Sequence, residues 1–181
     1  LDFVTDDDKK FSYAASFGEI IEEKYYENLK IVLEKFSICS VREKQGCQII
    51  NNVSPKINTR IDIDPVFLLN KDGWEKAFNL SSNGKGKYVL VYLFRITNKT
   101  KELISILHKK GIKIIYIGKP LRNPFDCPVT FIPSADPVDF VKYFYSASFV
   151  ITNSFHGTAF SIMFNKPFAL ELYTNTSRLE N

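Results

Sequence analysis

Short apolar runs alternate with amphipathic stretches along most of this chain, and this alternation sets its fold class. We predict strands from the apolar runs, over residues 11–15, 38–41, 60–63, 88–94, 112–117, 129–132, 149–151 and 168–172. We predict helices from apolar residues at helical spacing, over residues 22–35, 43–52, 71–80, 99–110, 137–146 and 157–164. Alternating strands and helices of this kind indicate an α/β protein with parallel sheets.

Residues 81–87, Ser-Ser-Asn-Gly-Lys-Gly-Lys, interrupt the alternation. They are small, flexible and charged and show no apolar periodicity, which is typical of a linker. We therefore predict two doubly wound, Rossmann-like domains, over residues 1–80 and 88–181. The chain opens in what reads as a loop and closes in what reads as the start of a helix, so we expect a piece cut at both ends.

The charge and the cysteines exclude several classes of function. The net charge is +4, from 24 basic and 20 acidic residues that are dispersed, whereas nucleic-acid binding needs clustered basic residues. Cys39, Cys47 and Cys127 do not have the spacing of a zinc site or a disulfide framework, and Cys39 reads as a core residue. The apolar runs are shorter than a membrane span, and no secretory segment opens the chain. We expect a cytoplasmic protein without a transmembrane segment.

The stretch from Val150 to Ile162 contains the clearest candidate for chemistry. An apolar strand stops at small polar residues, and Ser154, His156, Gly157 and Thr158 lead into an apolar helix. The first N–H groups of a helix lack partners within it, and the helix dipole adds partial positive charge, so such a turn favours an anion beside the imidazole. A capped turn with a packing histidine is the alternative.

Two further loops follow predicted strands, where ligands bind in open α/β sheets. One contains Ser16, and the other contains Arg42 directly before Glu43. Arginine suits a carboxylate, because its planar fork donates two parallel hydrogen bonds. If the domains face each other across a cleft, we expect Arg42 and His156 to meet on one ligand. A solvated ion pair with Glu43 is the alternative for Arg42, and we interpret Asp64 as a turn residue before a proline.

These residues lie in blocks that resemble the polysaccharide pyruvyl transferase family. The resemblance is spread over most of the chain and rests on Tyr13–Gly18, Ser40–Lys44, Asp64–Trp74 and, most specifically, Thr152–Ser161 with Phe164–Phe168. The family often has threonine where this chain has Val66, which weakens a chemical role for the Asp64 segment. The glycine-rich segment expected near the family's N-terminus is absent, so we expect the first domain to be incomplete and this piece alone to be inactive.

The resemblance implies a glycosyltransferase-B-like architecture and a specific reaction. Pyruvate would move from phosphoenolpyruvate onto two hydroxyls of a sugar as a cyclic ketal, without any further cofactor. Such sugars belong to bacterial capsule, exopolysaccharide or cell-wall polymers, and a lipid-linked acceptor would bring the enzyme to the inner membrane face.

The candidate residues fit this donor. We expect Arg42 to bind the carboxylate, while the N–H groups near Gly157 and Thr158, with the hydroxyls of Ser154 and Thr158, hold the phosphate. His156 is the candidate general acid that protonates the enol carbon, and anions beside it favour its charged form.

Ser16 and Arg178 are further candidates, as residues that contact the donor or the acceptor. Two other functions remain open from the sequence. One is a glycosyltransferase of similar architecture that uses a nucleotide sugar, and the other is a non-catalytic module that binds sugar or phosphate. Protection by a sugar nucleotide, in place of phosphoenolpyruvate, would distinguish the first of these alternatives.

Overall fold

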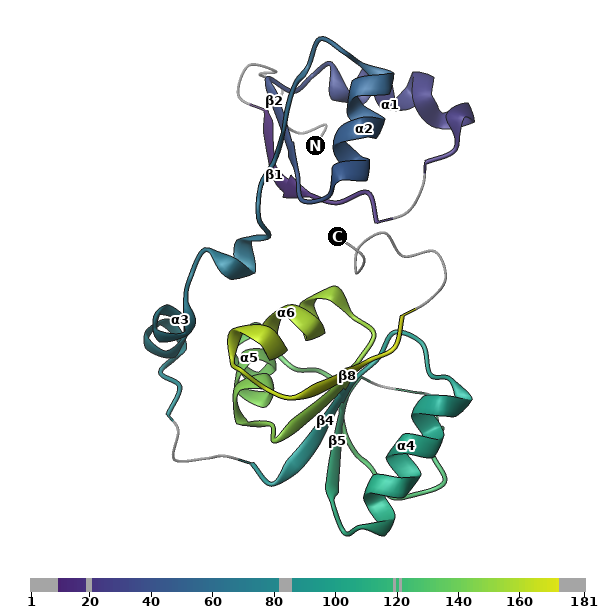
Figure 1. The fold of residues 1–181 in the computed structure, drawn as a ribbon, viewed down its shortest axis with the longest axis vertical. Coiled ribbons are helices and arrows are strands. Elements are labelled where there is room, and N and C mark those ends of the chain that lie inside the picture. The colour runs from purple at the N-terminus through teal and green to yellow at the C-terminus, as the bar shows by residue number, and fades with distance from the viewer. Residues whose placement is uncertain (1–9, 19–20, 82–85, 119, 121, 173–181) are drawn as a thin grey trace. The chain divides into compact units, whose positions relative to one another are not determined.

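The computed structural model describes residues 10–172 apart from residues 19–20, 82–85, 119 and 121. Within this range the chain forms two compact units, the first ending at Leu68 and the second beginning at Leu69. Each unit is built on one parallel sheet with helices packed against it (Figure 1). The predicted α/β class with two parallel sheets is confirmed.

The first unit has three parallel strands in the order β1-β2-β3. Its elements are β1 (Phe11–Ala15), η2 (Glu23–Tyr25), α1 (Tyr26–Leu33), β2 (Ile38–Val41), α2 (Lys44–Val53), β3 (Asn58–Ile61) and η3 (Pro65–Phe67). Residues from α1, α2 and β2 form one apolar core of Leu33, Cys39, Val41, Ile49, Ile50 and Val53. Cys39 is therefore a core residue, as predicted, and its burial raises the pKa of the thiol.

The second unit has five parallel strands in the order β6-β5-β4-β7-β8. Its elements are α3 (Lys71–Phe78), β4 (Tyr88–Tyr92), α4 (Asn98–Lys109), β5 (Lys113–Ile117), β6 (Thr130–Ile132), α5 (Pro137–Ser146), β7 (Phe149–Thr152), α6 (Phe155–Met163) and β8 (Phe168–Leu170). The central strand β4 is buried, and the chain winds outward from it in both directions. Helices α5 and α6 lie on one side of the sheet and α4 on the other (Figure 1).

Helix α3 packs in the second unit, although the sequence placed it in the first domain. The ring of Trp74 meets Phe160 of α6 edge-on at 5.2 Å, and the Tyr145 hydroxyl donates to Glu75 Oε1 at 2.9 Å. The division between the units consequently falls after Leu68, ahead of the predicted linker at residues 81–87. Local periodicity in the sequence does not report contacts between residues so far apart, so it could not predict where α3 packs.

Near the turn between β7 and α6, one strand end and one helix start differ from the prediction. Strand β4 ends at Tyr92, two residues before the predicted end, because the Phe94 N–H binds Asn153 Oδ1 at 2.8 Å. Helix α6 begins at Phe155, two residues before the predicted start, because Ser154 caps it. Among the described helices, none is both long and apolar enough to cross a membrane.

Candidate active site

The turn between β7 and α6 is a network of buried polar groups. Thr152 Oγ1 donates to the Tyr92 carbonyl at 2.8 Å and accepts the Ser154 N–H at 3.1 Å. Ser154 Oγ in turn accepts the Gly157 N–H at 3.4 Å, which caps the first turn of α6. The network fixes the start of the helix at the carboxyl end of β7.

Gly157 and Thr158 stabilise this turn, and their N–H groups are hydrogen-bonded within it. The Thr158 N–H and its hydroxyl both donate to the Ser154 carbonyl, each at 3.0 Å. A side chain at Gly157 would press on β7, since a Cβ there would lie 2.9 Å from Thr152 Cβ. That the N–H groups around these two residues hold a phosphate stays a prediction. In the structure, the N–H groups of Gly157 and Thr158 themselves donate to Ser154 Oγ and to the Ser154 carbonyl.

His156 is the exposed residue of this turn. Its ring lies edge-on to that of Phe155, with the two centroids 5.4 Å apart. The neighbouring Asn153 is buried and fixes the β4–α4 connection to the end of β7, donating to the Arg95 carbonyl at 2.7 Å. An exposed imidazole on a rigid turn at a strand's carboxyl end is well placed to transfer a proton to a bound ligand.

Arg42 follows β2 in the first unit and belongs to a buried ion pair. Its Nη1 donates to Asp64 Oδ2, and its Nε lies 3.9 Å from Glu43 Oε2. The side chain of Arg42 is 16% exposed, and those of both carboxylates are 4% exposed. The pair with Glu43 that we considered from the sequence is therefore present but largely buried, and Asp64 is the nearer partner.

Asp64 contributes more to the candidate site than its prediction as a turn residue implied. It does cap the turn before Val66, whose N–H donates to Asp64 Oδ1 at 3.0 Å. Its other oxygen pairs with Arg42, so the segment after β3 bears directly on the candidate site. The available signal was a carboxylate that interrupts an apolar run just after the strand predicted at residues 60–63, as Arg42 follows the strand predicted at residues 38–41.

Ser16 lies in the loop after β1, beside Glu43. The Phe17 N–H donates to Glu43 Oε1 at 2.9 Å. Ser16 Oγ and Glu43 Oε2 are buried and find no hydrogen-bond partner among the residues that the structure describes. Buried polar atoms are rarely left without a partner, so these two atoms mark the carboxyl end of the first sheet as a candidate binding region.

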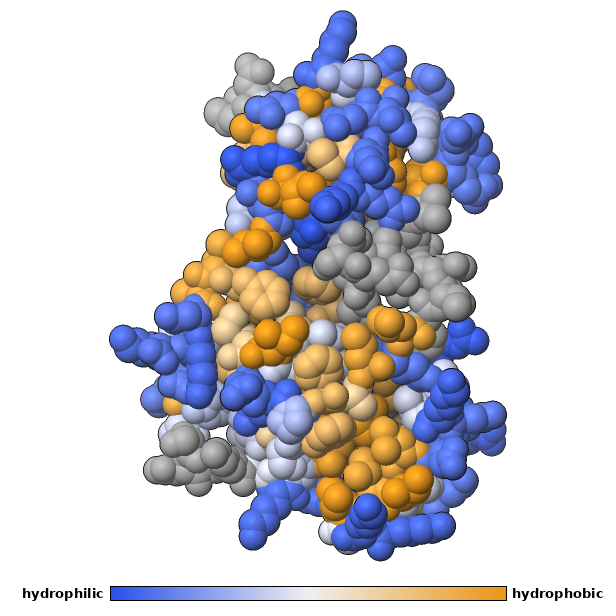
Figure 2. Space-filling view, in the orientation of Figure 1, coloured by the Kyte–Doolittle hydropathy of each residue, from blue (hydrophilic) through white to orange (hydrophobic). Residues whose placement is uncertain are grey.

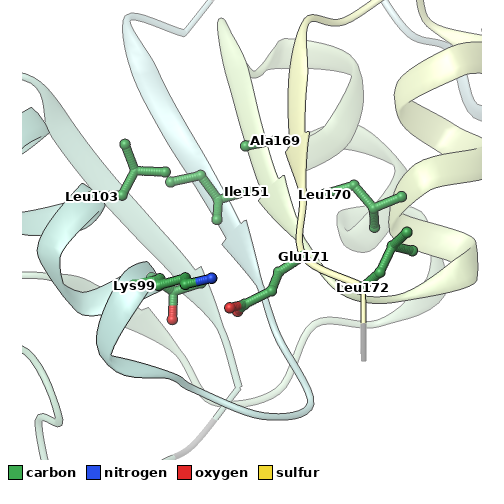
Figure 3. A pocket seen from close by; sticks show the side chains of 8 residues that line it. Lys99, Leu103, Ile151, Ala169, Leu170, Glu171 and Leu172 are labelled. Atoms are coloured by element: carbon green, nitrogen blue, oxygen red, sulfur yellow. The ribbon is translucent and has the colours of Figure 1, made fainter. Parts of the chain in front are cut away.

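A cavity of about 480 Å³ opens at the carboxyl ends of β7 and β8, on the side of α4. Leu103, Ile151 and Ala169 form its apolar wall, while Lys99 and Glu171 point toward each other at its mouth (Figure 3). The Thr97 hydroxyl lies 2.8 and 2.9 Å from the two Glu171 oxygens, which holds the carboxylate in place. No pattern in the sequence predicted this cavity.

A second cavity, of about 490 Å³, extends the apolar surface along α4 (Figure 2). Its lining includes Val89, Leu107, Ile112 and Phe149, and it shares Leu103 with the first cavity. This second cavity has few polar groups, so it offers little to orient a small polar ligand.

The predicted site residues thus fall into two groups. Ser16 and Arg42 lie in the first unit, and Ser154, Gly157 and Thr158 surround His156 in the second, each group at the carboxyl end of its own sheet. Arg178 lies outside the described residues. Within the described part of the chain, no cluster of three or more histidine, cysteine or carboxylate side chains is arranged to hold a metal ion.

The fold defines an α/β protein built on two parallel sheets. The chain belongs to the polysaccharide pyruvyl transferase family, whose model matches residues 1–174. No curated protein matches the chain.

A solved structure supports the fold class. The chain is similar to the crystal structure of Methanocaldococcus jannaschii UDP-GlcNAc 2-epimerase in complex with UDP-GlcNAc and UDP, with a TM-score of 0.55 and 14% sequence identity. The match covers 81% of this chain and 48% of that chain, so this chain spans about half the length of the epimerase. At this identity the likeness concerns the fold alone.

Proposed function

We propose that the protein transfers pyruvate from phosphoenolpyruvate to a pair of saccharide hydroxyls as a cyclic ketal, during the synthesis of a bacterial exopolysaccharide, capsule or cell-wall polymer. The observation that carries this proposal is the family match over residues 1–174. The exposed imidazole of His156 and the guanidinium of Arg42 supply the two side-chain types that the reaction calls for.

The reaction needs a proton at one carbon and two new bonds at its neighbour. The methylene carbon of phosphoenolpyruvate takes up a proton and becomes a methyl group, while one sugar oxygen bonds to the central carbon. The second sugar oxygen then displaces phosphate from that carbon. One donor and one diol give one ketal and one phosphate, with no oxidant or reductant consumed.

His156 is the proposed acid for the methylene carbon, because its ring is exposed on a turn that a network of hydrogen bonds holds in place. Ser154, Gly157 and Thr158 shape that turn, and the start of α6 adds partial positive charge near the bound anion. Because their N–H groups are engaged, we assign Gly157 and Thr158 this indirect part in binding the phosphate.

Arg42 is the proposed partner of the donor's carboxylate. A guanidinium carries five N–H donors in a fixed fork, so its pairing with Asp64 is compatible with a second carboxylate. Asp64 and Glu43 partly cancel the positive charge of Arg42. Its main contribution to binding the donor is therefore directional hydrogen bonding. Ser16, with its buried hydroxyl, lies on the same sheet end and is proposed to contact the donor or acceptor.

The test is to incubate the whole protein, as its gene encodes it, with phosphoenolpyruvate and a panel of saccharides, including lipid-linked ones. We expect phosphate release that depends on the saccharide, together with a saccharide product heavier by one pyruvate less one water. Phosphate release without any saccharide product, or no reaction with any acceptor, would count against the transfer.

A thermal-shift comparison separates the alternatives. Phosphoenolpyruvate at a hundredfold excess over its Kd should stabilise the protein by about 2.7 kcal/mol. Stabilisation by a sugar nucleotide, and not by phosphoenolpyruvate, would favour a glycosyltransferase. Stabilisation by saccharide or phosphate without turnover would favour a binding module.

A further inference from the structure

We propose that Asp64 and Glu43 are positioning residues, which together fix Arg42 and the Ser16 loop for donor binding. This inference rests on the proposed function. It assigns a role to two buried carboxylates, for which the sequence alone predicted a turn residue at Asp64 and a solvated ion-pair partner at Glu43.

Asp64 ties the guanidinium to a rigid turn. Each of its oxygens serves a different group, since Oδ1 accepts the Val66 N–H and Oδ2 accepts Arg42 Nη1. The next residue, Pro65, begins the short helix η3, and the Phe67 N–H donates to the Asp64 carbonyl at 2.9 Å. Because both oxygens of Asp64 are hydrogen-bonded, its carboxylate is fixed, and the Arg42 side chain that binds it has little freedom to rotate.

Glu43 connects the same arginine to the Ser16 loop. Its Oε1 accepts the Phe17 N–H, and its Oε2 lies 3.9 Å from Arg42 Nε. Gly46, in the first turn of α2, leaves room for this arrangement, because a Cβ there would lie 3.3 Å from the Phe17 ring and 3.4 Å from Glu43 Oε1. One buried side chain therefore contacts both candidate donor-binding segments.

The backbone holds the loop at two further points. The Ala14 N–H donates to Ser40 Oγ at 3.0 Å, at a residue whose φ of 47° breaks the register of β1. The Arg42 N–H donates to the Ala15 carbonyl at 3.0 Å. Together with the bond from Phe17 to Glu43, these contacts attach the loop on both sides of Ser16.

Stability alone is a poor explanation for this cluster. Two buried carboxylates surround a guanidinium that is only partly exposed, and apolar residues of similar volume often stabilise a protein as well or better. Fixed geometry is what such a cluster supplies and an apolar core does not.

The first experiment measures how well Arg42 is held, independently of any ligand. Asp64→Asn keeps an oxygen for the Val66 N–H and removes the charge that pairs with Arg42. We expect phenylglyoxal to modify Arg42 several-fold faster in this variant than in wild type, relative to the exposed Arg122 in the same sample. Glu43→Gln is measured in parallel in case Asp64→Asn does not fold. An unchanged ratio in a folded variant overturns the inference.

The second experiment tests whether Asp64 acts through Arg42. We expect Asp64→Asn to weaken phosphoenolpyruvate binding about tenfold, equivalent to about 1.4 kcal/mol. The same substitution in an Arg42→Ala background should cause no further loss. Losses that add in the double variant would show a merely structural role and overturn the inference.

The two experiments also separate this inference from the proposed function. Absence of phosphoenolpyruvate binding in wild type contradicts the proposed function, whereas the phenylglyoxal ratio still decides whether the carboxylates hold Arg42.

Discussion

Gly157 lies so close to Thr152 that no side chain fits between them: a Cβ on Gly157 would come within 2.9 Å of Thr152 Cβ. Replacing glycine by alanine inside a helix normally stabilises it by about 1 kcal/mol. Here we expect Gly157→Ala to destabilise the protein by about 1–3 kcal/mol, because β7 and α6 must separate.

Urea unfolding measures this difference, with Gly73→Ala in α3 as the control. A Cβ at Gly73 would meet nothing nearer than 3.3 Å, so Gly73→Ala should lower the free energy of unfolding clearly less than Gly157→Ala. Equal effects of the two substitutions would contradict the packing argument.

The Thr152 hydroxyl gives a second prediction. Thr152→Val keeps the shape of the side chain but leaves the buried Ser154 N–H without its acceptor and the Tyr92 carbonyl without its donor. We expect a loss of about 1–3 kcal/mol in the free energy of unfolding. Thr130→Val, near the sheet edge and exposed, is the control and should change stability little. Unchanged stability in Thr152→Val would mean that the network does not hold the turn.

Trp74, the single tryptophan of the chain, reports on the packing of α3 against α6. Phe160→Leu removes the ring that Trp74 meets and should move its fluorescence emission to longer wavelength, with a loss of about 1 kcal/mol. Val53→Ala, in the core of the first unit, should leave the emission of the folded protein unchanged. A shift of the emission in both variants would contradict the packing of α3 against α6.

The lowered pKa of the Asp62 carboxyl predicts that the stability of the protein depends on pH. The Ser40 hydroxyl donates to Asp62 Oδ2, and this bond, followed by the bond and charge of Arg60, holds the pKa of the carboxyl below its ordinary value. A lowered folded pKa contributes stability above the ordinary pKa, and this contribution is lost as the pH falls through the lowered value. Asp62→Asn should therefore melt at a lower temperature than wild type near neutral pH, and the gap should close in acid.

Ser40→Ala is the control for this dependence, since it removes the largest cause of the lowered pKa. The difference in melting temperature that Asp62→Asn causes should be smaller when it is made in a Ser40→Ala background. A difference of constant size across the pH range would contradict the assignment.

The strands and the α/β class were predictable because they depend on local patterns. Apolar periodicity over residues 11–15 and 137–146 predicted a strand and a helix with the bounds that the structure has. The turn at Ser154 was predictable for the same reason, since a capping residue and the helix that it caps are adjacent in sequence.

The rest depends on contacts between residues that are distant in sequence. The pairing of Arg42 with Asp64 joins the ends of two strands, and the contact between Trp74 and Phe160 moves α3 into the second unit. The engagement of the Gly157 N–H depends on the rotamer of Ser154, which sequence does not specify. These are the points at which the sequence-based predictions and the structure differ.

Proton transfer from His156 to the methylene carbon of phosphoenolpyruvate is the central claim, and transfer in deuterium oxide tests it most directly. The wild-type ketal should carry one deuterium in its methyl group, and His156→Gln should form it about 10²–10⁴-fold more slowly while melting at the wild-type temperature. Equal rates for the two proteins, or a ketal methyl without deuterium, would contradict the claim.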